Sequence, residues 1–454
     1  MKRFVILILA AGLVFSAAGG ASAVDVKVSG DWQVGFNFMD NMYNDYYAAE
    51  DHDGHSDGTF RATQRIRINM DIAVSEALSG RVQLQAAQAA QAAQGESSNN
   101  YTWGENSVGG PGKSVTARLA YLDWLIPSTD VKVRMGRQAV AMPSYTFGSS
   151  VLDDVIDGVV VNAPVNDMVA VNVGWLRADA EMQKWGTPHN PHSSIDLAFL
   201  AVDVASDGFK VTPWGMVGFH GSQTDDFDMV GNTPEDENTT AYWVGIGGEL
   251  SMFDPFTFTA DFLYSGNDGD RGAKRSGWYA ALGAEMKTAY VTPFLRGWYA
   301  SGDDDDADGE SGRMLSIDGA GGFDASGIYF GYYDQIVNTP DVCTAAGTWG
   351  VQLGVKEVSF IEDLTHMLSV TYFQGTNDDK SVKVGKRKGN SGPVGYMTTE
   401  DSAWSIDFLN SYKLYQNLTA NLLLSYLVTD FDRDVWGRDY DNIFRSTLNF
   451  TYSF

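Results

Sequence analysis

The sequence predicts an all-β chain that closes into a transmembrane antiparallel barrel. Many short segments alternate apolar and polar residues, and almost none carries the apolar stripe of a helix. Short and long connections follow one another along the chain. Beyond residue 23, no run of 18 or more apolar residues could form a membrane helix. A closed barrel is the other structure that pairs every backbone polar group inside a bilayer.

The first 23 residues have the pattern of a secretory signal peptide. Lys2 and Arg3 supply a positive start, an apolar stretch follows, and Ala21-Ser22-Ala23 forms a small-residue cleavage site. We therefore expect one exported barrel domain over residues 24–454. The net charge of -27 excludes a nucleic-acid partner, since such a chain repels phosphate groups. A single cysteine, Cys343, excludes a disulfide scaffold.

The strands show their two faces clearly. Within residues 256–264, Phe256, Phe258, Phe262 and Tyr264 share one face, and polar residues occupy most of the other. Residues 65–74 and 417–428 repeat this pattern. We count 20 candidate strands, of which two, at 314–318 and 328–333, are weak; without that pair the number is 18, within a range of 16 to 20.

The connections sort by length. Short turns at 127–130, 205–208 and 253–255 separate long acidic, glycine-rich loops, among them 40–60, 88–114 and 375–401. Barrels of the outer membrane have short periplasmic turns and long extracellular loops. A barrel of about 18 strands has a lumen too wide for side chains to fill, so we expect the polar face to line a wet channel.

The last strand, residues 444–454, ends on Phe454 with apolar residues on one face. It resembles the terminal strand that Gram-negative outer-membrane barrels present to their assembly machinery. An ordinary amphipathic strand at a domain end is the alternative. The resemblance implies an outer-membrane location, with membrane lipid, lipopolysaccharide and the assembly machinery as partners.

Residues 131–138, Val-Lys-Val-Arg-Met-Gly-Arg-Gln, and the stretch up to Val155 are similar to the fifth strand and third loop of trimeric general porins. In that family the third loop folds into the pore, and its acidic residues face basic residues on the wall. The resemblance therefore implies a homotrimer and a constriction formed by the following residues: loop acids Asp153, Asp154 and Asp157, and wall residues Arg65, Arg67, Lys132 and Arg134, which share the polar face of their strands. Ordinary lumen positions away from the narrowest point are the alternative.

Arg137 has the opposite parity to Lys132 and Arg134, so it points outward. A charge facing lipid is unfavourable. The resemblance implies a trimer interface here, where Glu96 or Glu105 of the second loop could pair with Arg137. A position in the headgroup zone is the alternative.

A weak calcium signal lies at Asp304, Asp306 and Asp308, which match the first half of a calcium-binding loop. The twelfth position is Leu315 where a glutamate is needed, so a solvated acidic loop is the alternative. Five basic residues within 380–388 could touch lipopolysaccharide phosphates, or form a solvated loop tip.

The sequence lacks the common nucleophile, phosphate-binding and zinc motifs, so we expect neither an enzyme nor a cofactor. The leading hypothesis is a porin for passive diffusion of small hydrophilic solutes and ions. A substrate-selective channel is the main alternative. A barrel enzyme, an adhesin and a soluble secreted binding protein rank below it.

Overall fold

The computed structural model describes residues 24–41, 58–86, 101–103, 115–180, 194–220, 239–268, 274–304, 310–317, 323–330, 345–383, 393, 396–437 and 439–454. The expected signal peptide lies outside these residues. Eighteen strands form the barrel, and a two-residue strand is added to its rim. Their bounds are β1 (Asp25–Asp40), β2 (Thr59–Ser75), β3 (Leu78–Ala86), β4 (Tyr101–Thr102), β5 (Val115–Leu125), β6 (Lys132–Ala141), β7 (Asp153–Asn166), β8 (Val169–Ala180), β9 (Ser194–Ser206), β10 (Phe209–His220), β11 (Thr239–Phe253), β12 (Phe256–Asn267), β13 (Ser276–Met286), β14 (Thr292–Ala300), β15 (Thr348–Ile361), β16 (Leu364–Gly375), β17 (Ser402–Tyr415), β18 (Leu418–Asp430) and β19 (Ile443–Ser453).

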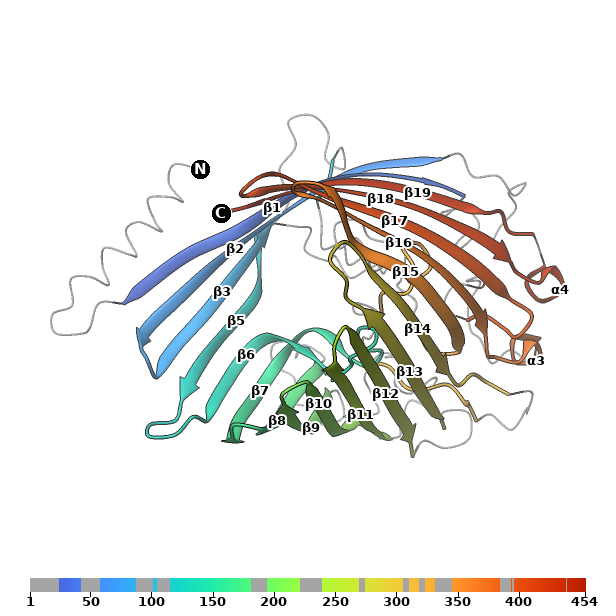
Figure 1. Cartoon of the computed structure of the whole chain (residues 1–454). Coiled ribbons are helices and arrows are strands. Elements are labelled where there is room, and N and C mark those ends of the chain that lie inside the picture. Colours follow the sequence, from blue (N-terminus) through green and yellow to red (C-terminus); the bar gives the residue numbers. More distant parts are fainter. Residues whose placement is uncertain are drawn as a thin grey trace, which may run out of the picture.

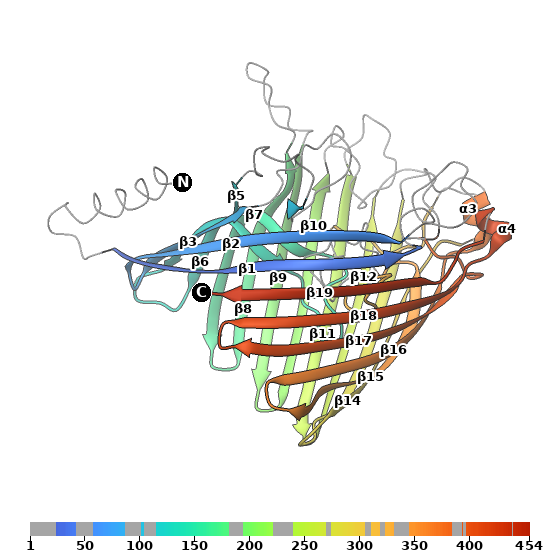
Figure 2. The same cartoon turned by 90° about the horizontal axis from the view of Figure 1, so that it is seen from above.

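The strands pair in chain order, all antiparallel, and the ring closes where β19 pairs with β1 (Figures 1 and 2). At the seam, the Phe454 N–H donates to Gly30 O at 3.0 Å, and the Gly30 N–H donates to Phe454 O at 2.8 Å. The short strand β4 pairs with Thr63 and Gln64, above the point where β3 leaves β2. The predicted barrel of 18 strands is therefore confirmed.

The two weak candidate strands do not join the sheet. Both lie in the connection between β14 and β15, and their described residues have no regular strand conformation. Met314, Leu315 and Phe330 are fully buried there. Their apolar residues pack inside the barrel and do not reach the membrane-facing surface.

The outward face of the wall is apolar and exposed. Val244, Ile246, Phe262, Leu282 and Leu353 project from it, as expected for side chains that meet lipid. At the loop end, aromatic side chains form a girdle whose rings pack in pairs: Trp278 with Tyr299 at 4.7 Å, and Tyr372 with Trp404 at 4.9 Å.

Two short helices, α3 (Asp379–Lys383) and α4 (Arg433–Trp436), lie in loops at the same end. Among the described residues, no helix has the length and apolarity needed to cross a membrane. The buried apolar cluster consists of inward side chains of the strands and of residues in loops that enter the lumen.

Candidate functional site

Three arginines lie on the inner face of the wall, on strands β2 and β5; Arg65 is buried, and Arg67 and Arg118 are half-buried. Each guanidinium donates a hydrogen bond to a glutamine on a neighbouring strand: Arg65 to Gln33 at 2.5 Å, Arg67 to Gln85 at 2.7 Å, and Arg118 to Gln83 at 3.2 Å. Strand pairing places Arg65 opposite Gln33 and Arg67 opposite Gln85, whereas Arg118 projects at a bulge between β3 and β5. We call Arg65, Arg67 and Arg118 the arginine wall.

Two carboxylates lie near the arginine wall. Asp31 on β1 is 3.9 Å from Arg65, and Asp154 on β7 interacts electrostatically with Arg67 and Arg118. Among the described residues, three guanidinium groups therefore face two carboxylates, which gives this part of the wall an excess of positive charge. Water confined between protein walls screens such a charge less than bulk water does.

Nearer the periplasmic turns, the cations of the same wall are paired with acids. Arg81 binds Asp71 through two contacts, at 2.6 and 3.0 Å, and Arg134 binds Asp123 at 2.7 and 2.8 Å. Lys132 shares the inward face of Arg134. Four of the predicted basic wall residues thus face the lumen, but Arg134 is neutralised by Asp123.

The loop between β6 and β7, residues 142–152, folds into the lumen as predicted. Asp261 on β12 accepts hydrogen bonds from the backbone N–H groups of Tyr145 at 2.8 Å and Thr146 at 2.7 Å. The Tyr145 hydroxyl lies 2.8 Å from the Thr212 hydroxyl on β10. Arg296 on β14 donates to the Thr146 carbonyl at 3.0 Å, so residues 142–152, here named the first segment, reach across the barrel.

A second segment, residues 323–330, enters the lumen from the connection between β14 and β15. Its Gly327 N–H donates to Asp407 on β17 at 3.0 Å, and its Gly327 carbonyl accepts from Arg445 on β19 at 2.6 Å. A Cβ atom at this glycine would lie 2.3 Å from Ser425 Oγ and 2.6 Å from Asp407 Oδ1. Only glycine fits so close an approach to the wall.

Aromatic rings join the two segments. Phe147 of the first segment packs against Phe323 of the second at 4.9 Å between ring centroids, and against Trp298 of β14 at 5.4 Å. Trp298 also contacts Phe323 and Phe330, at 5.2 and 5.5 Å. The segments therefore form one constriction, held against strands β10 and β12–β19 and facing the arginine wall.

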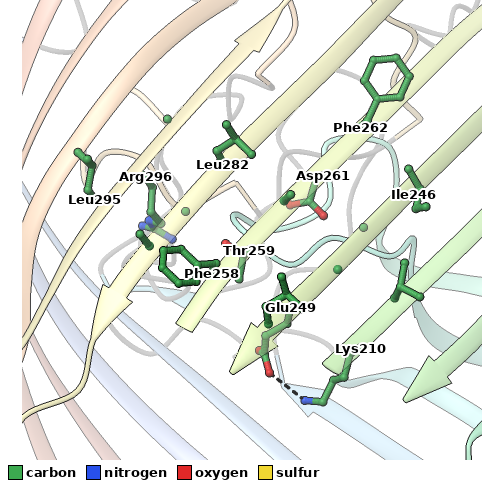
Figure 3. Close-up of a pocket in the computed structure, with 18 of the residues that line it drawn as sticks. Lys210, Ile246, Glu249, Phe258, Thr259, Asp261, Phe262, Leu282, Leu295 and Arg296 are labelled. Atoms are coloured by element: carbon green, nitrogen blue, oxygen red, sulfur yellow. Dashed lines mark ion pairs between the residues drawn. The ribbon is translucent and has the colours of Figure 1, made fainter. Parts of the chain in front are cut away.

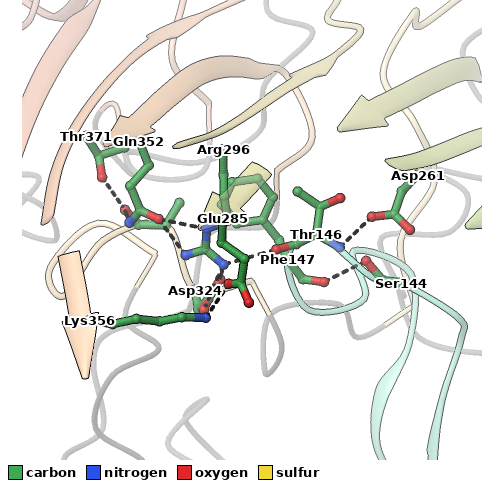
Figure 4. A network of polar contacts seen from close by, with 11 residues as sticks. Ser144, Thr146, Phe147, Asp261, Glu285, Arg296, Asp324, Gln352, Lys356 and Thr371 are labelled. Carbon is green, nitrogen blue, oxygen red and sulfur yellow. Dashed lines mark hydrogen bonds and ion pairs between the residues drawn. The ribbon is translucent and has the colours of Figure 1, made fainter. Parts of the chain in front are cut away.

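Arg296 is the centre of the polar network that fixes this constriction (Figure 4). Besides Thr146, its guanidinium contacts Asp324 of the second segment at 3.0 Å and Gln352 of β15 at 2.9 and 2.5 Å. A cavity of about 350 Å³ lies beside it, lined also by the ion pair of Lys356 with Glu285, whose atoms are 2.5 Å apart.

A larger hollow, of about 840 Å³, lies on the wall formed by β10–β15 (Figure 3). The outward side chains of Ile246, Phe258, Phe262, Leu282 and Leu295 line it. Its lining also includes inward residues of the same strands, among them Asp261 and Arg296, but its exposed surface is almost entirely apolar, so the hollow belongs mainly to the membrane-facing surface.

The mouth of the barrel is tied together by a buried acid, Asp401. Its carboxylate accepts from the Thr398 N–H at 2.7 Å, the Asp432 N–H at 2.8 Å and Trp436 Nε1 at 3.0 Å. Burial raises the pKa of the Asp401 carboxyl above its ordinary value, although these hydrogen bonds oppose the shift.

The structure corrects three predicted site residues. Asp153, Asp154 and Asp157 lie on β7 and not in the loop, because β6 and β7 remain paired as far as Ala141 and Asp153. Asp154 faces the lumen, but Asp153 and Asp157 have outward parity, so the prediction that these two line the constriction is wrong.

Arg137 points outward, as its parity predicted, and pairs with Asp157 of the same chain at 2.9 Å. Its expected partners Glu96 and Glu105 lie outside the described residues, as do Asp306 and Asp308 of the possible calcium site. Asp304 is described, and the described part of the chain contains no cluster of three metal-binding side chains.

The residues that hold the constriction were missed by sequence reasoning. Asp261, Arg296 and Arg445 each sit at a polar position of an alternating strand, which is the one signal that marks them as lumen residues. Their partners are 115, 150 and 118 residues away along the chain, so spacing could not reveal them.

No known protein-family model matches this chain, and no curated protein matches it. Several solved structures do match this chain. OccK2 (OpdF) of Pseudomonas aeruginosa, determined in complex with glucuronate, aligns with a TM-score of 0.54 at 12% identity over 94% of this chain and 98% of that chain. This chain has the porin fold.

Two further structures from Pseudomonas aeruginosa show the same likeness. OpdK with vanillate aligns with a TM-score of 0.53 at 10% identity, covering 94% of this chain and 98% of that chain. OccK11 (OpdR) aligns with a TM-score of 0.53 at 10% identity, covering 94% and 95%. At such low identity, the likeness shows the porin fold and does not extend to individual residues.

Proposed function

We propose that this protein is a substrate-selective channel of the outer membrane, which passes small organic anions along the arginine wall. The observation that carries the proposal is that the two sides of the lumen differ: one holds the constriction and the other holds the arginine wall. The two inward segments are anchored on β10 and β12–β19. The half-buried guanidinium groups of Arg67 and Arg118 line the opposite side, together with the buried Arg65. A solute that passes the constriction therefore meets fixed positive charge.

The geometry of these arginines suits carboxylates. A guanidinium presents several N–H donors in a plane and binds a carboxylate through two parallel hydrogen bonds. The glutamines Gln33, Gln83 and Gln85 hold the three side chains in fixed orientations, which reduces the cost of ordering them when a solute arrives. Two of the similar porin-fold proteins were solved with organic acids, glucuronate and vanillate.

Transport by this route needs no cofactor and no energy input, because the solute moves down its gradient. The polar lumen supplies the path and the constriction supplies the selection. A general diffusion porin, the leading hypothesis from sequence, shares the fold and selects mainly by the size of the solute.

Uptake of glucuronate and glucose by proteoliposomes tests the proposal, since these solutes are similar in size and differ in one carboxylate. We expect glucuronate to enter faster than glucose, and we expect the preference to shrink in the Arg67→Gln/Arg118→Gln variant. Arg81→Gln is the matched control, because Arg81 faces the same lumen but is paired with Asp71. Equal entry of both solutes contradicts selectivity and favours general diffusion.

A further inference from the structure

Four charged side chains form a row across the outward face of β6–β9. Strand pairing places Arg137 beside Asp157, Asp157 beside Arg177, and Arg177 beside Asp196. Arg137 contacts Asp157 at 2.9 Å, and Arg177 binds Asp196 through two contacts of 2.9 Å each. We call these four residues the charged row.

The charged row interrupts the aromatic girdle. Asp196 is paired with Phe219 of β10, and aromatic residues continue from there around the barrel, through Tyr242, Tyr264, Trp278 and Tyr299. Beside the row, the nearest outward side chains of β6–β9 are small apart from Trp175 and Met135: Ala139, Ala141, Val155, Val159 and Ala198.

The row also descends into the apolar band. Strands of such barrels tilt by about 40° from the barrel axis, and the row runs perpendicular to them, so it slopes by the same angle from the membrane plane. It crosses three strand spacings of about 4.8 Å. The row therefore spans roughly 9 Å of depth. Arg137 is its deeper end, seven residues beyond the turn at 127–130, whereas Asp196 is ten residues before Ser206 at the end of β9 and is paired with Phe219 of the girdle. Charged side chains that face acyl chains become more costly toward the bilayer centre. Lipid is thus a poor neighbour for Arg137 and Asp157, whose side chains are 45% and 59% exposed.

The order of charges makes the row complementary to itself. Read from β6 to β9 the signs are plus, minus, plus, minus, so the reversed order opposes every charge with its opposite. A two-fold axis along the membrane normal, midway between Asp157 and Arg177, brings two rows together in this reversed order. Because both rows slope, they cross, and the two central residues meet most closely.

We propose that the outward face of β6–β9 is the contact surface between two copies of this chain, in which Arg177 of each copy pairs with Asp157 of the other. The inference rests on the membrane placement in the proposed function, but not on its solute. In this arrangement Asp157 meets the opposite charge of Arg177 of the other copy instead of lipid, and Arg137 meets the wall of the other copy below its Asp196. It differs from the three-fold assembly that the resemblance implied, in which the second loop would pair with Arg137.

Disulfide trapping in intact outer membranes tests the contact. In a Cys343→Ser background, a tagged Asp157→Cys chain is co-expressed with an untagged Arg177→Cys chain, so that a bond between these positions must join two copies. We expect oxidation to link the tagged to the untagged chain. Val370→Cys, on the outward face of β16, is the matched control and should not link. Absence of the 157–177 link, or equal linking through Cys at position 370, overturns the proposal.

Native mass spectrometry in mild detergent provides the second measurement. We expect two copies for the parent and one for Asp157→Asn/Arg177→Gln, which removes the central charges while keeping side-chain size. Heat-modifiable migration on gels shows whether the variant barrel is folded. A parent of one copy or of three overturns the proposal.

Single-channel recording of the same samples separates this inference from the proposed function. A conducting parent that contains one copy refutes the contact alone. A parent of two copies that passes no current refutes the channel and leaves the contact standing.

Discussion

Asp261 should control how firmly the first segment blocks the lumen. Its carboxylate accepts two backbone hydrogen bonds, from Tyr145 and Thr146, at 2.8 and 2.7 Å. A hydrogen bond to a charged group contributes about 1.5 to 3 kcal/mol, and loss of the acceptor leaves buried N–H groups unpaired. Asp261→Ala should therefore weaken the anchoring of the segment by about 3 kcal/mol or more.

That loss is large enough to be seen in single channels. Since about 1.4 kcal/mol is a factor of ten in an equilibrium constant, 3 kcal/mol raises the displaced population of the segment roughly a hundredfold. We expect a higher mean conductance and added flicker in planar bilayers. Asp123→Asn is the matched control, because Asp123 is a lumen carboxylate that binds Arg134 of the neighbouring strand and not the first segment. Unchanged conductance and noise in Asp261→Ala would refute the role assigned to this residue.

Three further predictions concern the constriction and the mouth. Gly327→Val should unseat the second segment, because its side chain would overlap Ser425 and Asp407, and conductance should rise; an unchanged channel would contradict the close approach. Phe147→Ala should lower the unfolding free energy by about 3 to 5 kcal/mol and loosen the contact between the two segments. The temperature of the heat-modifiable transition measures this loss. A temperature shift no larger than that of Tyr290→Ala, at an exposed residue, would count against a stabilising role of the aromatic cluster. Burial raises the pKa of Asp401, so the contribution of this group to stability is greatest below its unfolded pKa and falls as pH rises through the raised folded value. The protection factors of the Thr398 and Asp432 amides, which compare each exchange rate with the intrinsic rate at the same pH, should therefore fall over that pH window. Asp401→Asn should remove this fall, and an unchanged fall in the variant would assign it to another group.

The wall of this barrel could be predicted from the sequence because the face on which each wall residue lies depends only on the alternation within its own strand. A strand between lipid and water must alternate, so the parity of Arg65, Arg67 and Arg137 could be read directly, and the structure places all three on the expected faces. The segments at 314–318 and 328–333, weak as strand candidates, lie outside the sheet in the structure.

The interior could not be predicted in the same way. Asp153 and Asp157 were assigned to a loop, but Val140 and Ala141 continue the pairing of β6, and the chain leaves the sheet only at Met142, just before Pro143. The anchors Asp261, Arg296 and Arg445 bind segments more than a hundred residues away, through contacts that form only when the ring closes. Local pattern carries no information on such pairs.

The most direct test of the account is the reversal potential of single channels under a salt gradient. If the arginine wall lines the path, the parent channel favours anions, and Arg67→Gln/Arg118→Gln shifts the reversal potential toward that of a cation-selective pore, while Arg81→Gln shifts it less. A parent that favours cations, or a double variant whose reversal potential matches the parent, would show that solutes do not pass along Arg65, Arg67 and Arg118.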